Sequence, residues 1–212
     1  MELLLDQIGQ LGIIPVVKIE DPGQAHGLGQ ALIDGELPIT EITFRTKAAQ
    51  EAISILVQDF PEMLVGAGTI LNIQQAETAV EAGARFIVSP GFAPKVVGWC
   101  LDRNVLVIPG VATPSDIIMA MDFGLTVLKF FPANVLGGPA AIKAISPVFK
   151  DIRFIPTGGL SALNLPEYLA LPSVLACGGS WMVKSEFIIS GNFTQITFFS
   201  HEAVTIVKNS RE

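Results

Sequence analysis

Lys129 lies in the middle of an apolar run, TVLKFFPAN (126–134), and its amine is the first group in the chain that could do chemistry. If Val127 to Phe131 forms a strand, alternate side chains face the same way, so Lys129 and Phe131 share one side. Apolar surroundings favour the neutral amine, which attacks carbonyl carbon and forms a Schiff base. The protonated imine then draws electrons from an adjacent carbon–carbon bond. The structural alternative is a lysine at a strand end that reaches water or an acidic partner.

A second polar set occurs in the stretch ITEITFRT (39–46). Glu41, Thr43 and Arg45 alternate with apolar residues, so they share one face of a strand. A carboxylate can act as a general acid/base, and the planar fork of an arginine suits a carboxylate ligand. If this face points into the same interior as Lys129, the nearby cation of Arg45 would further favour the neutral amine. The structural alternative is an ion pair between Glu41 and Arg45.

The elements that must position these residues alternate regularly along the chain. Short apolar runs are typical of buried parallel strands, and the segments between them have helical periodicity. The predicted strands span 13–19, 39–44, 63–69, 86–90, 105–111, 126–132, 152–159 and 173–180, and the clearest helices span 46–60, 72–84, 93–104 and 113–124. Alternating βα units indicate parallel strands joined by crossover helices. Eight units predict an α/β fold, a closed (β/α)8 TIM barrel that forms one domain over residues 1–212, and an open doubly wound sheet is the alternative.

Most predicted strands end in small, Gly/Pro-rich or polar residues. In a barrel the active site is built from the loops at these carboxyl ends, where glycine lets the backbone approach a ligand closely. The triplets TGG (157–159) and GGS (178–180) follow the seventh and eighth predicted strands, where many barrels bind phosphate. The alternative for both triplets is a tight turn without a ligand.

Composition excludes several classes of function. The chain has 212 residues, of which 50% are hydrophobic and 16% charged, with mean hydropathy +0.54 and net charge −7. The negative charge argues against nucleic acid or an anionic membrane as a partner, and the apolar composition favours association with other subunits. Two cysteines and two distant histidines provide neither a disulfide framework nor a His/Cys metal site, although carboxylate-bound magnesium stays open. We expect a cytoplasmic protein, because there is no signal peptide or long apolar span, and we expect no cofactor.

Seven motifs together resemble the KDPG/KHG aldolases, the class I pyruvate aldolases that act on 2-keto-3-deoxy-6-phosphogluconate and 4-hydroxy-2-oxoglutarate. They occur in the family's order and spacing from Leu5 to Lys208, and they are ITEITFRT, VGAGTI, IVSPGF, VIPGVATPSD, LKFFPAN, FIPTGGL and CGGSWMV. The resemblance implies a lyase of the Entner–Doudoroff pathway that forms a homotrimer. It further implies that Lys129 forms the Schiff base with the pyruvate carbonyl and that Glu41 is the general acid/base.

The resemblance also assigns the substrate-binding residues. Arg45 and Thr69 would hold the pyruvate carboxylate and neighbouring oxygens, and the Pro90 carbonyl would line the pocket. The remaining positions would contact the substrate or its phosphate, with Thr157 and Ser180 linked to stereochemical preference at C4, and they are Phe131, Thr157, Gly158, Gly159, Gly179 and Ser180. Lys18 stands where some relatives carry arginine, so it is a phosphate ligand or simply a lysine at the barrel rim.

Three classes of function remain open at this stage. An aldolase would cleave 2-dehydro-3-deoxy-6-phosphogluconate, or its galactonate epimer, to pyruvate and glyceraldehyde 3-phosphate. It could also cleave 4-hydroxy-2-oxoglutarate to pyruvate and glyoxylate. A phosphosugar isomerase or epimerase of the same fold would use Glu41 without an imine. A non-catalytic phosphosugar-binding barrel would need neither group. Lys129 and Glu41 are both present, which favours the aldolase.

Overall fold

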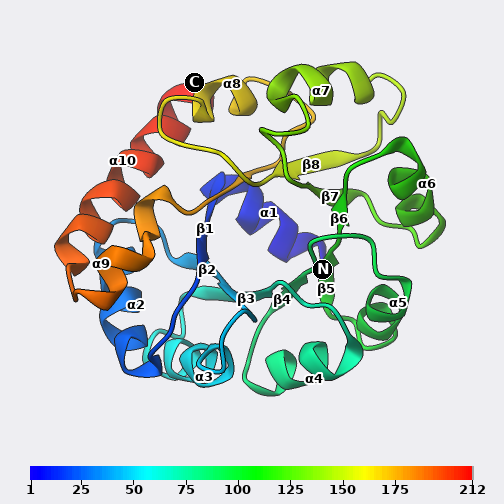
Figure 1. Ribbon diagram of the computed structural model, residues 1–212. Helices are drawn as coiled ribbons and strands as arrows, with labels where there is room; N and C mark the ends of the chain where they lie inside the picture. Colours follow the sequence, from blue (N-terminus) through cyan, green and yellow to red (C-terminus); the bar gives the residue numbers. More distant parts are fainter. Residues whose placement is uncertain (212) are drawn as a thin grey trace.

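The protein is a parallel β-barrel surrounded by helices, in a computed structural model that describes residues 1–211 (Figure 1). The strands are β1 (Ile13–Val17), β2 (Ile39–Thr43), β3 (Leu64–Gly68), β4 (Phe86–Val88), β5 (Leu106–Ile108), β6 (Gly110–Val111), β7 (Val127–Phe130), β8 (Arg153–Pro156) and β9 (Cys177–Gly179). The helices are α1 (Glu2–Leu11), α2 (Ala25–Asp34), α3 (Ala49–Asp59), α4 (Ile73–Glu81), α5 (Pro94–Asp102), α6 (Pro114–Asp122), α7 (Gly138–Ile145), α8 (Leu165–Leu169), α9 (Ser185–Ile189) and α10 (Phe193–Arg211), with short 3-10 turns η1 (Pro22–Gln24) and η2 (Trp181–Val183).

Two seams decide whether the sheet is open or closed. The strands pair in the orders β5-β4-β3-β2-β1-β9 and β6-β7-β8, all in parallel. At one seam, β5 and β6 are two halves of one strand on either side of Pro109, whose carbonyl accepts a hydrogen bond from the Lys129 N–H at 2.9 Å. At the other seam, Thr157 bridges to Gly178, and the Phe154 N–H donates to the Ser173 carbonyl at 2.7 Å. The barrel is therefore closed with eight strands, and the predicted TIM barrel is confirmed over the open-sheet alternative.

Most predicted strands run too far at their carboxyl ends. All observed strands except the β5/β6 strand, which ends at Val111 as predicted, stop before the last residues of the predicted range, and the released residues form loops at one end of the barrel. Proline at these positions has no N–H to donate to a neighbouring strand, and glycine favours turns. Thr69 takes a positive φ of 59°, which a strand does not allow. The loops that the sequence placed at strand ends are thus the loops that surround the barrel mouth.

Helix α1 was not predicted, and it crosses the opposite end of the barrel (Figure 1). It ends at Leu11, directly before β1, so it lies at the amino ends of the parallel strands. Gly12 ends the helix in a left-handed conformation, and its N–H donates to the Ile8 carbonyl at 3.0 Å. The guanidinium of Arg211, at the end of α10, donates to the carbonyls of Gly9 and Leu175. This end of the barrel is covered by structure, so the opposite end is the open one.

Most barrel residues are buried on both faces, as in other parallel sheets covered by helices. Phe130 of β7 and Phe154 of β8 meet edge to face with ring centroids 6.1 Å apart. They lie on the face opposite to Lys129, because their neighbours along each strand alternate. Lys129 consequently points toward the barrel interior while its neighbours pack against the helices.

Candidate active site

A buried ion pair crosses the barrel interior between Lys129 of β7 and Glu41 of β2. The Lys129 Nζ lies 3.2 Å from Glu41 Oε1 and 3.5 Å from Oε2, and the two side chains are 7% and 4% exposed. Strands β2 and β7 are opposite each other, because β1, β9 and β8 separate them on one side and β3, β4 and the β5/β6 strand on the other. The two residues are 88 positions apart in sequence and meet only because the barrel closes.

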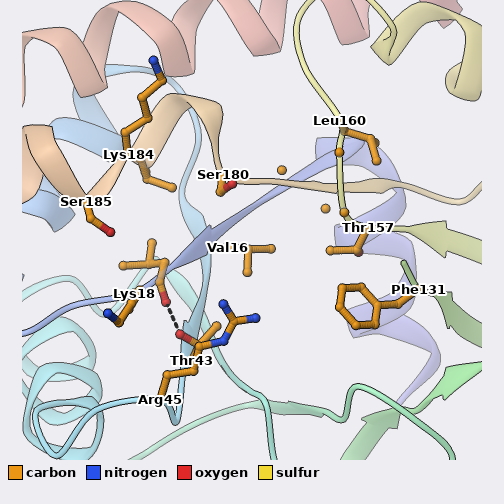
Figure 2. A pocket seen from close by; sticks show the side chains of 16 residues that line it. Val16, Lys18, Thr43, Arg45, Phe131, Thr157, Leu160, Ser180, Lys184 and Ser185 are labelled. Atoms are coloured by element: carbon orange, nitrogen blue, oxygen red, sulfur yellow. Dashed lines mark hydrogen bonds between the residues drawn. The ribbon is translucent and has the colours of Figure 1, made fainter. Parts of the chain in front are cut away.

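Backbone without side chains makes room for this pair. A Cβ at residue 68 on the neighbouring strand β3 would overlap with the Glu41 carboxyl group, so the glycine there is required by the carboxylate. On the other side of β2, the Thr43 hydroxyl donates to the Val17 carbonyl at 2.7 Å and ties β2 to β1 (Figure 2). A buried ion pair usually gains little net stability, because desolvation of both charges offsets their attraction. The Lys129–Glu41 pair is therefore better explained by a catalytic role than by a contribution to the stability of the fold.

Arg45 is separate from this pair. The structural alternative of a Glu41–Arg45 ion pair is not what the structure contains, because Glu41 is paired with Lys129. Arg45 is exposed at the barrel mouth, and its Nε donates to the Thr69 hydroxyl at 3.3 Å. In residues 1–211 it has no carboxylate partner. Its guanidinium points into an open cavity and is free to bind an anion (Figure 2).

That cavity lies at the carboxyl ends of the strands and has a volume of about 450 Å³ (Figure 2). Thr43 and Phe131 line it, each two residues beyond a member of the pair, so Glu41 and Lys129 lie deeper in the barrel. The Lys129 Nζ is 5.5 Å from the centroid of the Phe131 ring. The predicted site residues that line the cavity are Lys18, Arg45, Phe131, Thr157, Gly158, Gly159, Gly179 and Ser180.

Thr69 and Pro90 do not line this cavity. Thr69 contacts the site through its hydrogen bond with Arg45 and thus holds the guanidinium in place. The Pro90 carbonyl lies against Gly110, where a Cβ would overlap with it, and Gly110 pairs in register with Lys129. Pro90 is therefore close to the backbone of Lys129 on the side of the barrel away from the cavity's glycine loops.

The glycines at the mouth have a structural reason of their own. Gly158 and Gly159 have φ values of 100° and 80°, in the region that favours glycine. A Cβ at Gly159 would overlap with the Asn134 side chain, and one at Gly179 would overlap with the Trp181 ring. Packing alone therefore demands these glycines, and the tight-turn alternative accounts for their identity whether or not phosphate binds.

Gly178, the first residue of the predicted GGS triplet, also lines the cavity, as do residues that the sequence did not mark as ligands, namely Val16, Val17, Thr43, Leu160, Val183, Lys184 and Ser185. Thr43 shares the parity of Glu41 and could have been included. Lys184 and Ser185 follow η2, and no motif or periodicity marks them. The Lys184 Nζ points away from the cavity (Figure 2), lying 3.6 Å from Glu186 Oε1 and 5.5 Å from the Phe187 ring centroid.

The two cysteines are not competing nucleophiles. Both Cys100 and Cys177 are free and buried. Burial raises the pKa of the Cys100 thiol to about 12 and raises the pKa of the Cys177 thiol further, which leaves almost no thiolate at neutral pH. The amine of Lys129 is thus the group best suited to attack a carbonyl in this barrel.

Comparison with known proteins agrees with this geometry. The profile of the KDPG and KHG aldolases matches residues 5–199. The chain belongs to this aldolase family. It is 46% identical to 2-dehydro-3-deoxy-phosphogluconate aldolase of Treponema pallidum, covering 98% of this chain and 99% of that one, and 41% identical to KHG/KDPG aldolase of Escherichia coli K12, covering 91% and 90%.

Solved structures of family members superpose closely on the barrel. The KDPG aldolase of Zymomonas mobilis ZM4, solved with 3-phosphoglycerate, is 38% identical and covers 94% of each chain with a TM-score of 0.88. The KDPG aldolase of Legionella pneumophila, solved with pyruvate captured as a covalent carbinolamine, is also 38% identical, covers 92% of this chain and 95% of that chain, and has a TM-score of 0.90. A barrel of this family therefore holds pyruvate covalently in at least one relative.

Proposed function

We propose that this protein is a class I aldolase that cleaves 2-dehydro-3-deoxy-6-phosphogluconate to pyruvate and glyceraldehyde 3-phosphate through a Schiff base on Lys129. The buried contact between Lys129 and Glu41, at 3.2 Å beneath an open cavity, is the observation that carries the proposal. It puts a nucleophile and a proton carrier at the same point. The family relationship and the carbinolamine in the Legionella relative support the same chemistry.

The first half of the reaction forms the imine. The Lys129 ammonium first gives one proton to Glu41, and the freed amine attacks the C2 carbonyl carbon of the substrate while a proton moves from nitrogen to the former carbonyl oxygen. Glu41 then returns its proton to that oxygen, which leaves as water and gives a protonated imine. Glu41 is within hydrogen-bond reach of the nitrogen, so it can accept and return these protons.

The second half breaks the C3–C4 bond. Glu41 takes the proton of the C4 hydroxyl, whose oxygen becomes the carbonyl of the departing aldehyde. The electron pair of the C3–C4 bond forms a C2–C3 double bond, and the imine electrons move to nitrogen to give an enamine. Return of the proton to C3 gives the pyruvate imine, and water hydrolyses it to pyruvate and free Lys129.

The ends of the substrate find different partners in the cavity. The exposed guanidinium of Arg45, held by Thr69 and without a carboxylate partner among residues 1–211, suits the carboxylate of the pyruvate half. The loops around Gly159 and Gly179 line the far side of the cavity, and with Ser180 and Lys18 they would take the phosphate. Thr157 lies on the cavity wall beside Phe131 (Figure 2), and we assign it the contact with the substrate that sets the stereochemical preference at C4.

Two related activities are part of the proposal's test. The Escherichia coli relative is named for both KHG and KDPG, so 4-hydroxy-2-oxoglutarate is a second candidate substrate. A retro-aldol assay coupled to pyruvate detection should compare this compound, the phosphogluconate substrate and its galactonate epimer. We expect the highest kcat/KM with the phosphogluconate. No pyruvate from any of the three would leave an isomerase or a binding barrel as the explanation of the pocket.

We further propose a homotrimer. Exposed large apolar side chains occur around α4 and α6, which flank α5 (Figure 1), and they include Leu71 at 60%, Ile118 at 53% and Met121 at 44%. Association would remove this α4–α6 surface from water. Light scattering should give a trimer mass for the wild type and for the control Ile189→Asp on α9, whereas Ile118→Asp with Met121→Asp should reduce the mass. A wild-type monomer at micromolar concentration would contradict the proposal.

In residues 1–211 no helix combines the length and apolar character needed to cross a bilayer. Location in the cytoplasm stays a prediction.

A further inference from the structure

We propose that Glu20 sets the enzyme's affinity for phosphorylated substrates by acting as a competing anion for Lys18. The inference rests on the proposed aldolase function and concerns the phosphate end of the same cavity. The Lys18 Nζ lies 2.6 Å from Glu20 Oε1, and Lys18 lines the cavity while Glu20 does not. The ammonium that would meet the phosphate is therefore already engaged from outside the cavity.

The backbone on either side of Glu20 is fixed. Ile19 is fully buried, and its carbonyl accepts a hydrogen bond from the Thr46 hydroxyl at 2.5 Å. Asp21 begins η1, and its carboxylate accepts from the Gly23 N–H at 2.9 Å. Both Lys18 and Glu20 thus project from an anchored segment, so their encounter is built into the end of β1 rather than left to a loose loop.

The three cations around the cavity are in different states. Arg45 has no carboxylate partner in the part of the chain that the structure describes, and its guanidinium points into the cavity (Figure 2). Lys184 is held by Glu186 with its Nζ directed away from the cavity (Figure 2). Lys18 and Lys184 both lie on the cavity wall and both face a carboxylate, but the Lys18–Glu20 contact is the closer of the two, at 2.6 Å against 3.6 Å. Glu20 is therefore the acidic residue positioned to oppose an incoming anion.

A phosphate monoester carries nearly two negative charges at neutral pH and must replace Glu20 as the partner of Lys18. The Lys18–Glu20 pair is about half exposed, at 46% and 50%, so water screens it and its strength is modest. Removing the carboxylate should lower KM for the phosphorylated substrate by about two- to five-fold. Pyruvate has no phosphate, so its capture by Lys129 should not change.

The test is Glu20→Gln, with Glu36→Gln as the matched control. Glu36 makes a similarly exposed pair with Lys208, at 2.9 Å, on the outer surface of the protein. We expect Glu20→Gln to lower KM for 2-dehydro-3-deoxy-6-phosphogluconate with kcat unchanged, and to tighten inhibition by inorganic phosphate by a similar factor. KM for 4-hydroxy-2-oxoglutarate should stay constant, and Glu36→Gln should change none of these values. The gain should shrink at high salt.

A second variant distinguishes a competing anion from simple repulsion. In a Lys18→Gln background, Glu20→Gln should leave KM where Lys18→Gln alone puts it. An equal gain in that background would show that Glu20 acts on the phosphate directly and would overturn the inference, as would an unchanged KM in Glu20→Gln itself. Phosphorus NMR line broadening with inorganic phosphate measures the same change without turnover, so a failure of the aldolase assignment would be recognised separately.

Discussion

Two lysine–glutamate pairs at the site, one inside the barrel and one at its rim, differ in depth. Lys129 and Glu41 are 3.2 Å apart and almost wholly buried, whereas Lys18 and Glu20 are 2.6 Å apart and about half exposed. The shorter distance belongs to the pair with the smaller expected effect, because water and salt screen charges at the rim far more than inside the barrel. Burial, more than distance, separates the group that does chemistry from the group that adjusts binding.

Lys129→Arg should cause the largest loss. Arginine keeps the positive charge and approximate length but cannot form an imine, so cleavage should fall by several orders of magnitude. Steady-state assays with circular dichroism would separate lost chemistry from lost fold. Near-normal turnover in a well-folded Lys129→Arg enzyme would show that the buried Lys129–Glu41 pair is structural and not catalytic.

Glu41→Gln should come second. The amide keeps the shape and can still accept a hydrogen bond from Lys129, but it cannot carry a proton. We expect kcat to fall by about 10²- to 10⁴-fold, the usual contribution of a placed acid/base. Borohydride reduction should still trap some pyruvate on this variant. An unchanged kcat would assign the proton transfers to another group or to water.

Arg45→Ala should act on binding. Loss of a charge-assisted contact should raise the pyruvate concentration needed for half-maximal trapping by about 10- to 100-fold. Arg153→Ala is the matched control, because Arg153 is an exposed arginine at the amino-terminal start of β8, opposite to the mouth. If both variants behave alike, Arg45 is not the carboxylate ligand.

Ser180→Asp should have the smallest effect of the four and only at the rim. A carboxylate there would repel the phosphate and raise KM for the phosphorylated substrate by about 5- to 10-fold, while Ser180→Asn should have little effect. This exposed residue is a better probe than Gly159 or Gly179, where a side chain would overlap with Asn134 or Trp181. A raised pyruvate requirement for trapping in Ser180→Asp would show a general distortion of the mouth.

Sequence patterns predicted the barrel and the inward face of β2 for a physical reason. Alternation places Glu41, Thr43 and Arg45 on one face, and repeated βα units require a parallel sheet. The contact between Glu41 and Lys129 was not readable from the pattern, since it joins residues 88 positions apart and depends on barrel closure. The expected influence of Arg45 on Lys129 followed from parity alone, whereas the structure pairs Lys129 with Glu41 and places Arg45 at the mouth.

Local packing explains what else the sequence could not predict. Most strands were predicted to end too late, because an apolar run does not reveal where proline, glycine or a positive φ ends the pairing between strands. Glycine is required at positions 68 and 159 because a Cβ there would overlap with Glu41 and Asn134, which belong to other strands or loops. Similarly, Lys184 reaches the cavity wall through η2, for which the sequence had no periodic signal.

The most direct test of the central claim is to incubate the protein with pyruvate and borohydride and to map the modified peptide by mass spectrometry. We expect one reduced pyruvate adduct per chain, located on Lys129, and no adduct in Lys129→Arg. Labelling of Lys18 or Lys184 in place of Lys129, or an unmodified protein that still releases pyruvate from its substrate, would contradict the Schiff-base mechanism.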